Sequence, residues 1–224
     1  MPRQLSFDLP VKTAHGREDF FVSAANATAV AMIEAWQTWT SRKLVLAGAE
    51  GSGKTHLVHV WADLSDAQIV DAASLPDADI PALSSSCVAV ESCDTISGHS
   101  VAEEALFHLH NLTLANGHSL LCTARRAPKF WTTALPDLAS RMQGTPVVTL
   151  EAPDDALLTA VMAKLFHDRQ IVPAAEVLPY LVPRIDRSFA KARAVVEALD
   201  AAALEQGRAL TRVLAKQVLD KGVA

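Results

Sequence analysis

The chain has 224 residues, of which 50% are hydrophobic, and its formal net charge is −5 at pH 7. This length and apolar content can bury a sizeable core, as one large domain or as one domain with a small appendage. The acidic balance disfavours a nucleic-acid groove, because neutralising phosphates needs clustered lysine and arginine. We therefore expect no direct sequence-specific DNA binding.

The cysteines and the hydropathy pattern indicate a compartment. The three cysteines form no CxxC pair, which disfavours a disulfide framework or a zinc ribbon. The first ten residues lack the apolar core of a signal peptide, and no run of 18 uncharged apolar residues follows. These features predict a cytoplasmic protein without a membrane segment.

Residues 1–17 show no helical period and end in a polar stretch, which is typical of an extended arm. A helical pattern then begins near Ser23, where Ser23 or Asn26 can cap the helix. From there to residue 150, short apolar runs alternate with helical patterns. We expect strands at 43–47, 68–72, 87–91, 119–123 and 146–150, and helices at 56–64 and 101–115. This alternation predicts an α/β fold, in which a parallel sheet carries helices on both faces.

The pattern changes after residue 150, beyond which no strand is expected. Helical patterns cover 154–168, 174–181, 188–206 and 211–220, and Asp154, Ser188 and Thr211 are suitable caps. The sequence thus predicts three parts. They are an arm at 1–17, an α/β domain at 18–150 and a small all-helical domain at 151–224.

One glycine-rich segment carries a specific chemical signal, since it fits G-x-x-x-x-G-K-[ST] at every fixed position. It lies between an expected strand and an expected helix, and its residues are Gly48, Ala49, Glu50, Gly51, Ser52, Gly53, Lys54 and Thr55. Glycines let successive backbone N–H groups approach phosphate oxygens, and the helix adds the positive end of its dipole. Lys54 can reach the terminal phosphates, and the Thr55 hydroxyl can bind Mg²⁺. The segment predicts binding of ATP or ADP.

A second acidic residue is expected at the end of a neighbouring strand, where Glu91 can hold Mg²⁺ together with Thr55. An efficient hydrolase of this kind has two adjacent carboxylates there, one for the metal and one for the attacking water. Here Ser92 follows Glu91, and a serine is no carboxylate base. Asp94 is an alternative base. We expect intrinsic ATP hydrolysis to be weak.

The phosphate loop continues into His56 and Leu57, and this GKTHL string resembles the AAA+ module of bacterial replication initiators of the DnaA type. The segment with Phe20, Val22 and Asn26 is similar to the part that this family places around adenine. The resemblance implies a P-loop AAA+ core with a helical lid. It also implies that Thr123, at a strand end, lies near the γ-phosphate.

Residues 136–141 (PDLASR) resemble the stretch of the family that carries an arginine finger, which makes Arg141 the candidate finger. The lid position where the family has a nucleotide-sensing arginine holds Ala190 instead. Lys191, Arg193 or Arg187 are alternatives for that role.

The arm adds a second resemblance. Its residues Gln4, Leu5, Ser6, Phe7 and Leu9 are similar to the peptide with which bacterial proteins bind the sliding clamp. Leucine and phenylalanine side chains can fill a hydrophobic groove, and the glutamine amide can enter a polar pocket. Unlike DnaA itself, the chain shows no helix-turn-helix domain after its helical part.

Clamp peptide and AAA+ module together resemble the Hda family of DnaA-homologous regulators. The resemblance implies two partners, the initiator DnaA and the DNA polymerase III β sliding clamp. It implies that Arg141 acts in trans on ATP bound to DnaA, which prevents over-initiation of replication. Self-association into a homodimer stays open.

Other interpretations remain at this stage. Arg141 can instead pair with Asp137 at i, i+4 on a helix surface. The chain can be a self-acting P-loop ATPase or kinase. It can also be an adaptor that positions replication proteins without stimulating hydrolysis.

Overall fold

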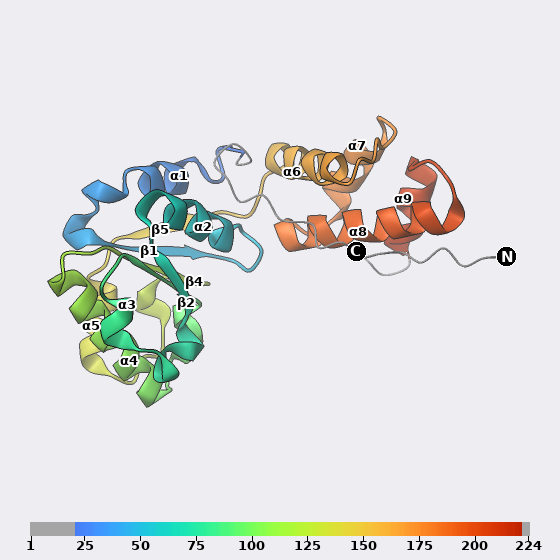
Figure 1. The fold of residues 1–224 in the computed structure, drawn as a ribbon. Coiled ribbons are helices and arrows are strands. Elements are labelled where there is room, and N and C mark those ends of the chain that lie inside the picture. The colour runs from blue at the N-terminus through green and yellow to red at the C-terminus, as the bar shows by residue number, and fades with distance from the viewer. Residues whose placement is uncertain (1–20, 221–224) are drawn as a thin grey trace.

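The computed structural model describes residues 21–220. These residues form a sheet-containing domain followed by a separate group of helices, joined by a short extended segment at residues 151–154 (Figure 1). The arm, with the predicted clamp-binding residues Gln4, Leu5, Ser6, Phe7 and Leu9, lies outside the described residues, and so does Phe20.

The first domain is built on a parallel sheet of five strands in the order β2-β3-β4-β1-β5. The strands are β1 (Lys43–Gly48), β2 (Gln68–Asp71), β3 (Val88–Glu91), β4 (Leu120–Ala124) and β5 (Val147–Leu150). β1 lies between β4 and β5, with Lys43 paired to Leu120 and Gly48 paired to Leu150. Nearly all of β1 and all of β4 are buried, as the apolar runs predict for central parallel strands.

Helices cover both faces of this sheet. Leu44 and Leu46 of β1 pack with α1 (Ala27–Glu34) and α2 (Lys54–Ser65), whereas Val45 faces the opposite side. That side is covered by α3 (Ile80–Leu83), α4 (Ser100–Ala115) and α5 (Pro136–Gln143). Successive side chains of a strand point to opposite faces of the sheet, so alternate strand residues belong to two different cores. The predicted fold class is confirmed.

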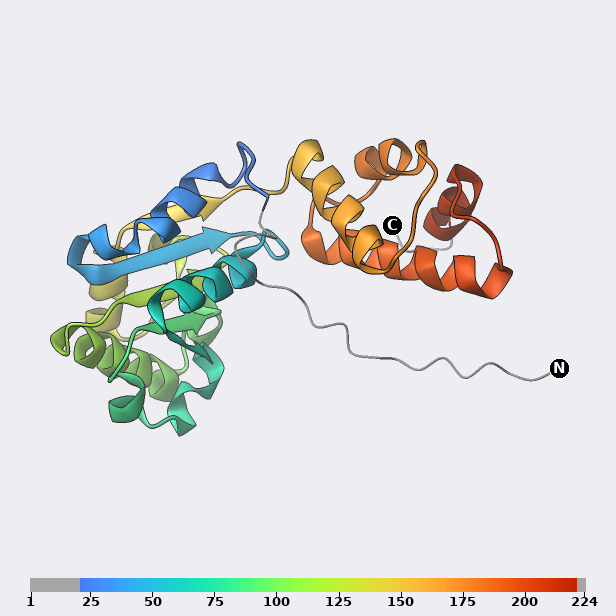
Figure 2. The same ribbon diagram turned by 45° about the horizontal axis from the view of Figure 1, so that its top comes forward.

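The second domain has its own apolar core. Its helices are α6 (Asp155–Asp168), α7 (Val177–Leu181), α8 (Phe189–Gln206) and α9 (Arg212–Val218), which lie together beside the sheet domain (Figure 2). Most of their buried apolar side chains form one cluster. Asp154 caps α6 by accepting from the Leu157 N–H, and Ser188 caps α8 by accepting from the Lys191 N–H. Thr211 stands at the start of α9, but its side chain makes no capping hydrogen bond.

Short 3₁₀ turns connect these elements, at Trp36–Thr38, Thr40–Arg42, Ala72–Asp77, Cys93–Ile96, Pro128–Phe130 and Val182–Arg184. Between residues 21 and 220, no helix has the length and apolarity needed to cross a membrane.

Candidate functional site

The predicted phosphate loop joins the end of β1 to the start of α2, at the carboxyl edge of the sheet. Gly51 and Gly53 have φ values of +71° and +100°, in the region that glycine adopts without strain. Ser52, between them, is buried, and its hydroxyl has no hydrogen-bond partner within residues 21–220. Buried hydroxyls normally have a partner, so the loop is suited to an added oxygen ligand such as phosphate.

Lys54 turns its ammonium group toward this loop. Nζ donates to the carbonyl oxygens of Gly48 at 2.7 Å and Ala49 at 2.8 Å. Burial lowers the pKa of Lys54, and the carboxylates of Asp94 and Glu50 partly oppose this effect. The positive charge is therefore held at the mouth of the loop by neutral acceptors, which leaves it available to an anion.

Thr55 and Glu91 are brought together, as the metal hypothesis requires. The Thr55 hydroxyl donates to Oε1 of Glu91 at 2.7 Å, which joins the first turn of α2 to the end of β3. A hydroxyl and a carboxylate are oxygen ligands of the kind that Mg²⁺ prefers, with phosphate oxygens and water completing the shell. The residues present thus fit a magnesium-nucleotide complex.

Ser92, next to Glu91, has a left-handed backbone with φ of +60°. Its N–H donates to the Thr123 hydroxyl at 3.0 Å, so Thr123 ties the end of β4 to the end of β3. The Asp94 carboxylate lies 3.8 Å from Nε of Arg125 and, through its charge, opposes the lowering of the Lys54 pKa. Asp94 is three residues beyond Glu91, near enough to Lys54 for its charge to act on that side chain.

Asn26 and Val22 occupy the segment that precedes α1. The buried Asn26 amide donates to the Phe21 carbonyl and accepts from the Ser23 N–H, which closes this segment into a turn. Val22 is exposed. The same segment hydrogen-bonds to Asp154, the cap of α6. The pKa of Asp154 is lowered mainly by the hydrogen bond from Leu157, and further by those from Ser23 and Ala25. The segment thus contacts the start of α6, where the second domain begins.

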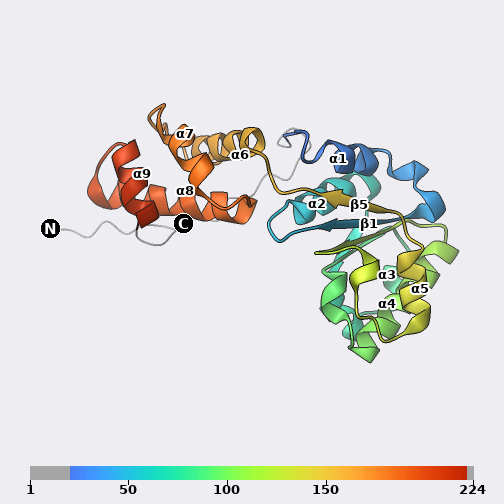
Figure 3. The same cartoon turned by 180° about the vertical axis from the view of Figure 1, so that it is seen from behind.

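The second domain also touches the phosphate loop directly. The Phe189 N–H, at the start of α8, donates to the Gly51 carbonyl at 2.9 Å. A side chain at Gly51 would approach Ser188 Cβ to 2.7 Å, and one at Gly53 would approach Phe189 Cε2 to 2.8 Å. Figures 1 and 3 both place the start of α8 beside the turn between β1 and α2. The second domain is thus positioned as a lid.

The lid position where the resembled family has a sensing arginine is Ala190, and a sensing role for Lys191 or Arg193 stays a prediction. Ala190 is exposed, and Arg187 pairs with Asp155 at 2.8 Å on the lid itself.

The sequence predicted neither Ser188 nor Phe189 as a contact of the loop. A polar cap followed by an aromatic residue gives no signal for such a contact.

Arg141 lies on the last turn of α5, at the other edge of the sheet. Its carbonyl accepts hydrogen bonds from Nζ of Lys43 at 3.2 Å and from the Thr145 hydroxyl at 2.8 Å. Lys43 begins β1, whereas the phosphate loop follows the end of β1, about 16 Å away at ordinary strand spacing. The Arg141 side chain is exposed, and within residues 21–220 it pairs with neither Asp137 nor another carboxylate.

His56 is half-buried in the first turn of α2, next to Thr55.

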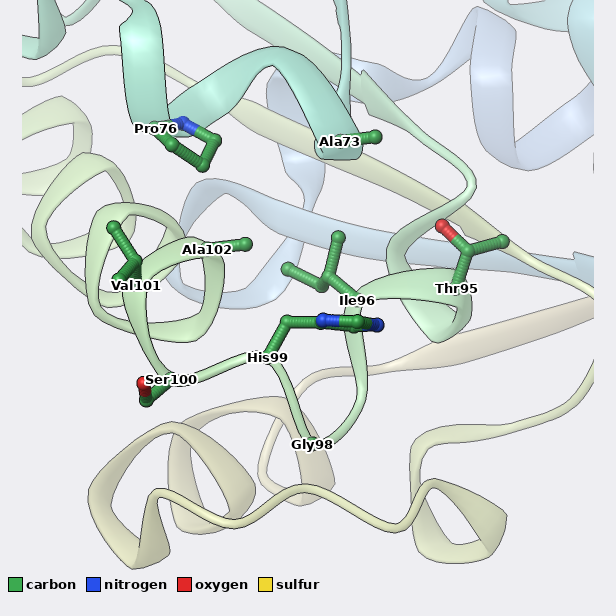
Figure 4. A pocket seen from close by; sticks show the side chains of 9 residues that line it. All are labelled: Ala73, Pro76, Thr95, Ile96, Gly98, His99, Ser100, Val101 and Ala102. Carbon is green, nitrogen blue, oxygen red and sulfur yellow. The ribbon is translucent and has the colours of Figure 1, made fainter.

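A hollow of about 610 Å³ lies away from the phosphate loop, between the 3₁₀ turn at Ala72–Asp77 and the start of α4 (Figure 4). It is lined by Ala73, Pro76, Thr95, Ile96, Gly98, His99, Ser100, Val101 and Ala102, and none of the predicted site residues is among them.

No protein-family profile matches the sequence. Among solved structures, the chain is similar to domain III of the replication initiation protein DnaA from Thermotoga maritima. The TM-score is 0.79 at 18% identity, and the match covers 96% of this chain and 99% of that chain.

AMPPCP-bound DnaA from Aquifex aeolicus gives a TM-score of 0.72 at 15% identity, over 87% of this chain and 67% of that chain. The FIGL-1 AAA domain in complex with ADP gives a TM-score of 0.64 at 15% identity, over 87% of this chain and 78% of that chain. Parallel sheet, phosphate loop and helical lid thus form a DnaA-like AAA+ fold.

Proposed function

We propose that this chain binds ADP or ATP with Mg²⁺ at the junction of the phosphate loop, the segment before α1 and the lid. The loop N–H groups and Lys54 would hold the phosphates, and Thr55 with Glu91 would hold the metal. Supporting observations are the left-handed Gly51 and Gly53, the Thr55–Glu91 hydrogen bond and the Lys54 ammonium at the loop. Similar folds are known with AMPPCP and with ADP.

We further propose that Arg141 acts as an arginine finger on the nucleotide bound to a partner protein. The main support is the position of Arg141. It lies at the amino edge of the sheet, one full strand length from the chain's own phosphate loop. Its guanidinium, unpaired within the described part of the chain, is free to stabilise charge that develops on a transferring phosphoryl group. Arginine fingers of this kind accelerate hydrolysis about 10³–10⁵-fold.

The partner that fits best is ATP-bound DnaA, and the chain then acts as a regulator of the Hda kind. The support is the DnaA-like fold, the PDLASR string and the clamp-like peptide at residues 4–9. The arm would recruit the protein to the β clamp on DNA, and docking against DnaA–ATP would yield DnaA–ADP. Ser92 in place of a second carboxylate agrees with weak turnover of the chain's own nucleotide.

The test incubates DnaA–ATP with clamp-loaded DNA and this protein, and follows ADP production. We expect the wild type to stimulate ADP production, and Arg141→Ala to reduce the stimulated rate at least 100-fold. Arg208→Ala, an exposed arginine of the lid, is the matched control and keeps full stimulation. The double variant Gln4→Ala, Leu5→Ala should lose the part of the stimulation that depends on the clamp. Absence of stimulation in the complete system refutes the regulatory function.

One observation favours a second candidate, a self-acting ATPase. The charge of Asp94 acts to raise the pKa of Lys54, and this carboxylate can take the place of the missing one beside Glu91. This candidate predicts steady ATP turnover by the purified chain alone, abolished by Glu91→Gln and Asp94→Asn but unaffected by Arg141→Ala.

A further inference from the structure

Helix α5, which carries Arg141, is fixed by side chains at both of its ends. Before its first turn, the Glu103 carboxylate of α4 accepts from the N–H groups of Ala134 and Leu135 at 3.0 and 2.7 Å. After its last turn, Lys43 and Thr145 both donate to the Arg141 carbonyl. The main chain that bears the Arg141 side chain is therefore held in one place.

Lys43 is the cation among these fixing groups, and its ammonium group contacts two neighbours. Nζ contacts Nε2 of His110 at 3.4 Å as well as the Arg141 carbonyl. An ammonium group has no acceptor, so Nε2 of His110 accepts and Nδ1 carries the proton toward Asn111 Oδ1 at 3.1 Å. His110 is buried and stands in its neutral form under this arrangement.

Within residues 21–220, the ion pairs include neither Lys43 nor Arg141, and the adjacent Arg42 donates to the Leu114 carbonyl. Burial first, and then the neighbouring Arg141 charge, lowers the pKa of Lys43. Within this part of the chain, the Lys43 ammonium is thus held by two neutral acceptors, the Arg141 carbonyl and Nε2 of His110.

We propose that Lys43 is a positioning residue for Arg141. By donating to the Arg141 carbonyl, Lys43 holds the last turn of α5, and with it the arginine side chain, in place. Because Lys43 acts through Arg141, this role rests on the proposed function. Lys43 starts strand β1 and its ammonium is fixed by two contacts, so it holds the main chain of Arg141 firmly. The guanidinium is then presented with less loss of conformational freedom on docking.

The experiment compares Lys43→Met, Lys43→Arg and Arg42→Met with the wild type, in the same assay with DnaA–ATP and clamp-loaded DNA. The maximal rate of ADP production and the half-saturating protein concentration are measured separately. Lys43→Met keeps the apolar stem but loses the charge and both donors. We expect its maximal rate to fall about tenfold, with half-saturation, the Tm and the ADP affinity of the chain's own site unchanged.

Lys43→Arg should recover most of the rate, and Arg42→Met, a neighbouring cation that does not touch Arg141, should leave the rate intact. In the Arg141→Ala background, Lys43→Met should change the residual rate less than twofold, since the two residues act as a unit. If Lys43→Met melts early, Lys43→Gln replaces it, retaining a donor without the charge.

Different failures have different meanings. Loss with Arg141→Ala but full rate with Lys43→Met overturns the role of Lys43 alone. Equal losses with Lys43→Met and Arg42→Met, or a loss that follows the Tm, also overturn it. Full stimulation with Arg141→Ala overturns both this role and the proposed function.

Discussion

Thr55 and Glu91 are 36 positions apart in the sequence, yet the threonine hydroxyl donates to the glutamate Oε1 at 2.7 Å. The contact arises because β1 and β3 lie in one parallel sheet, with only β4 between them, so both strands end at the same edge. The helix that follows β1 starts there as well. Two oxygen ligands suited to Mg²⁺ are consequently placed together by the fold.

This arrangement predicts that Thr55 acts through the metal. Thr55→Val removes the hydroxyl but keeps the shape of the side chain. We expect ADP affinity to fall about tenfold when Mg²⁺ is present and to stay unchanged in EDTA, where phosphate binding relies on the loop and Lys54. Isothermal titration calorimetry in the two buffers measures the difference.

The matched control is Thr159→Val, an exposed helical threonine of the lid whose hydroxyl bonds only to the Asp155 carbonyl. It should leave ADP affinity unaltered in both buffers. An equal loss for Thr55→Val with and without Mg²⁺ would assign the hydroxyl to phosphate binding and would contradict a metal role.

Glu103 is predicted to hold the loop that leads into α5. Its carboxylate accepts three backbone hydrogen bonds, from Gly98, Ala134 and Leu135, at 2.7–3.0 Å. Glu103→Gln replaces one acceptor oxygen by an amide that faces an N–H donor. An unsatisfied buried group costs about 1–3 kcal/mol, which lowers the Tm by about 2–4 °C per kcal/mol for a chain of this size. Thermal unfolding measures it.

The pH dependence provides a second measurement on the same residue. Burial raises the pKa of Glu103, but the three N–H groups outweigh it, so the folded pKa lies below the ordinary value of 4.5. Stabilisation by the carboxylate is therefore full above pH 4.5 and is lost as the pH falls through the lower folded value. The Gln variant should lack this component. Glu104→Gln, the exposed neighbour, should keep both the wild-type Tm and its acid dependence.

Much of the fold follows from local pattern. The apolar runs predicted all five strands to within one or two residues, and Asp154 and Ser188 form the capping hydrogen bonds that were expected. The loop motif placed its residues between a strand and a helix, as found. Such features depend on neighbours in the sequence, which is why the sequence alone can predict them.

The rest depends on distant residues. The short helix α3 was not expected, and α5 entered only as the surface helix on which Arg141 could pair with Asp137. One or two turns carry too little periodicity to distinguish such helices from loops. Asn26 stands at the N-cap of α1, as expected, but its side chain makes no capping hydrogen bond and instead closes the turn with Phe21 and Ser23. The pairing of Lys43 with the Arg141 carbonyl joins residues 98 positions apart, and only the sheet order brings them together.

The contact between lid and phosphate loop supports the last prediction. Phe189 is the first residue of α8, and its N–H has no acceptor within the helix, so the Gly51 carbonyl satisfies it. Gly51→Ala would place Cβ 2.7 Å from Ser188 Cβ, which forces the start of α8 away from the loop. We expect the Phe189 amide to lose protection from hydrogen exchange in the nucleotide-free protein.

Gly117→Ala is the control that separates this contact from backbone strain. Gly117 has a similar φ of +86°, but nothing lies within 4 Å of its added Cβ. Both variants carry the left-handed penalty of about 1–2 kcal/mol, and only Gly51→Ala collides with the lid. Faster exchange at Phe189 in Gly51→Ala alone therefore reports the lid contact. Equal exchange in the two variants would mean that the Gly51 carbonyl does not hold α8 in solution, and that the lid meets the loop only through bound nucleotide.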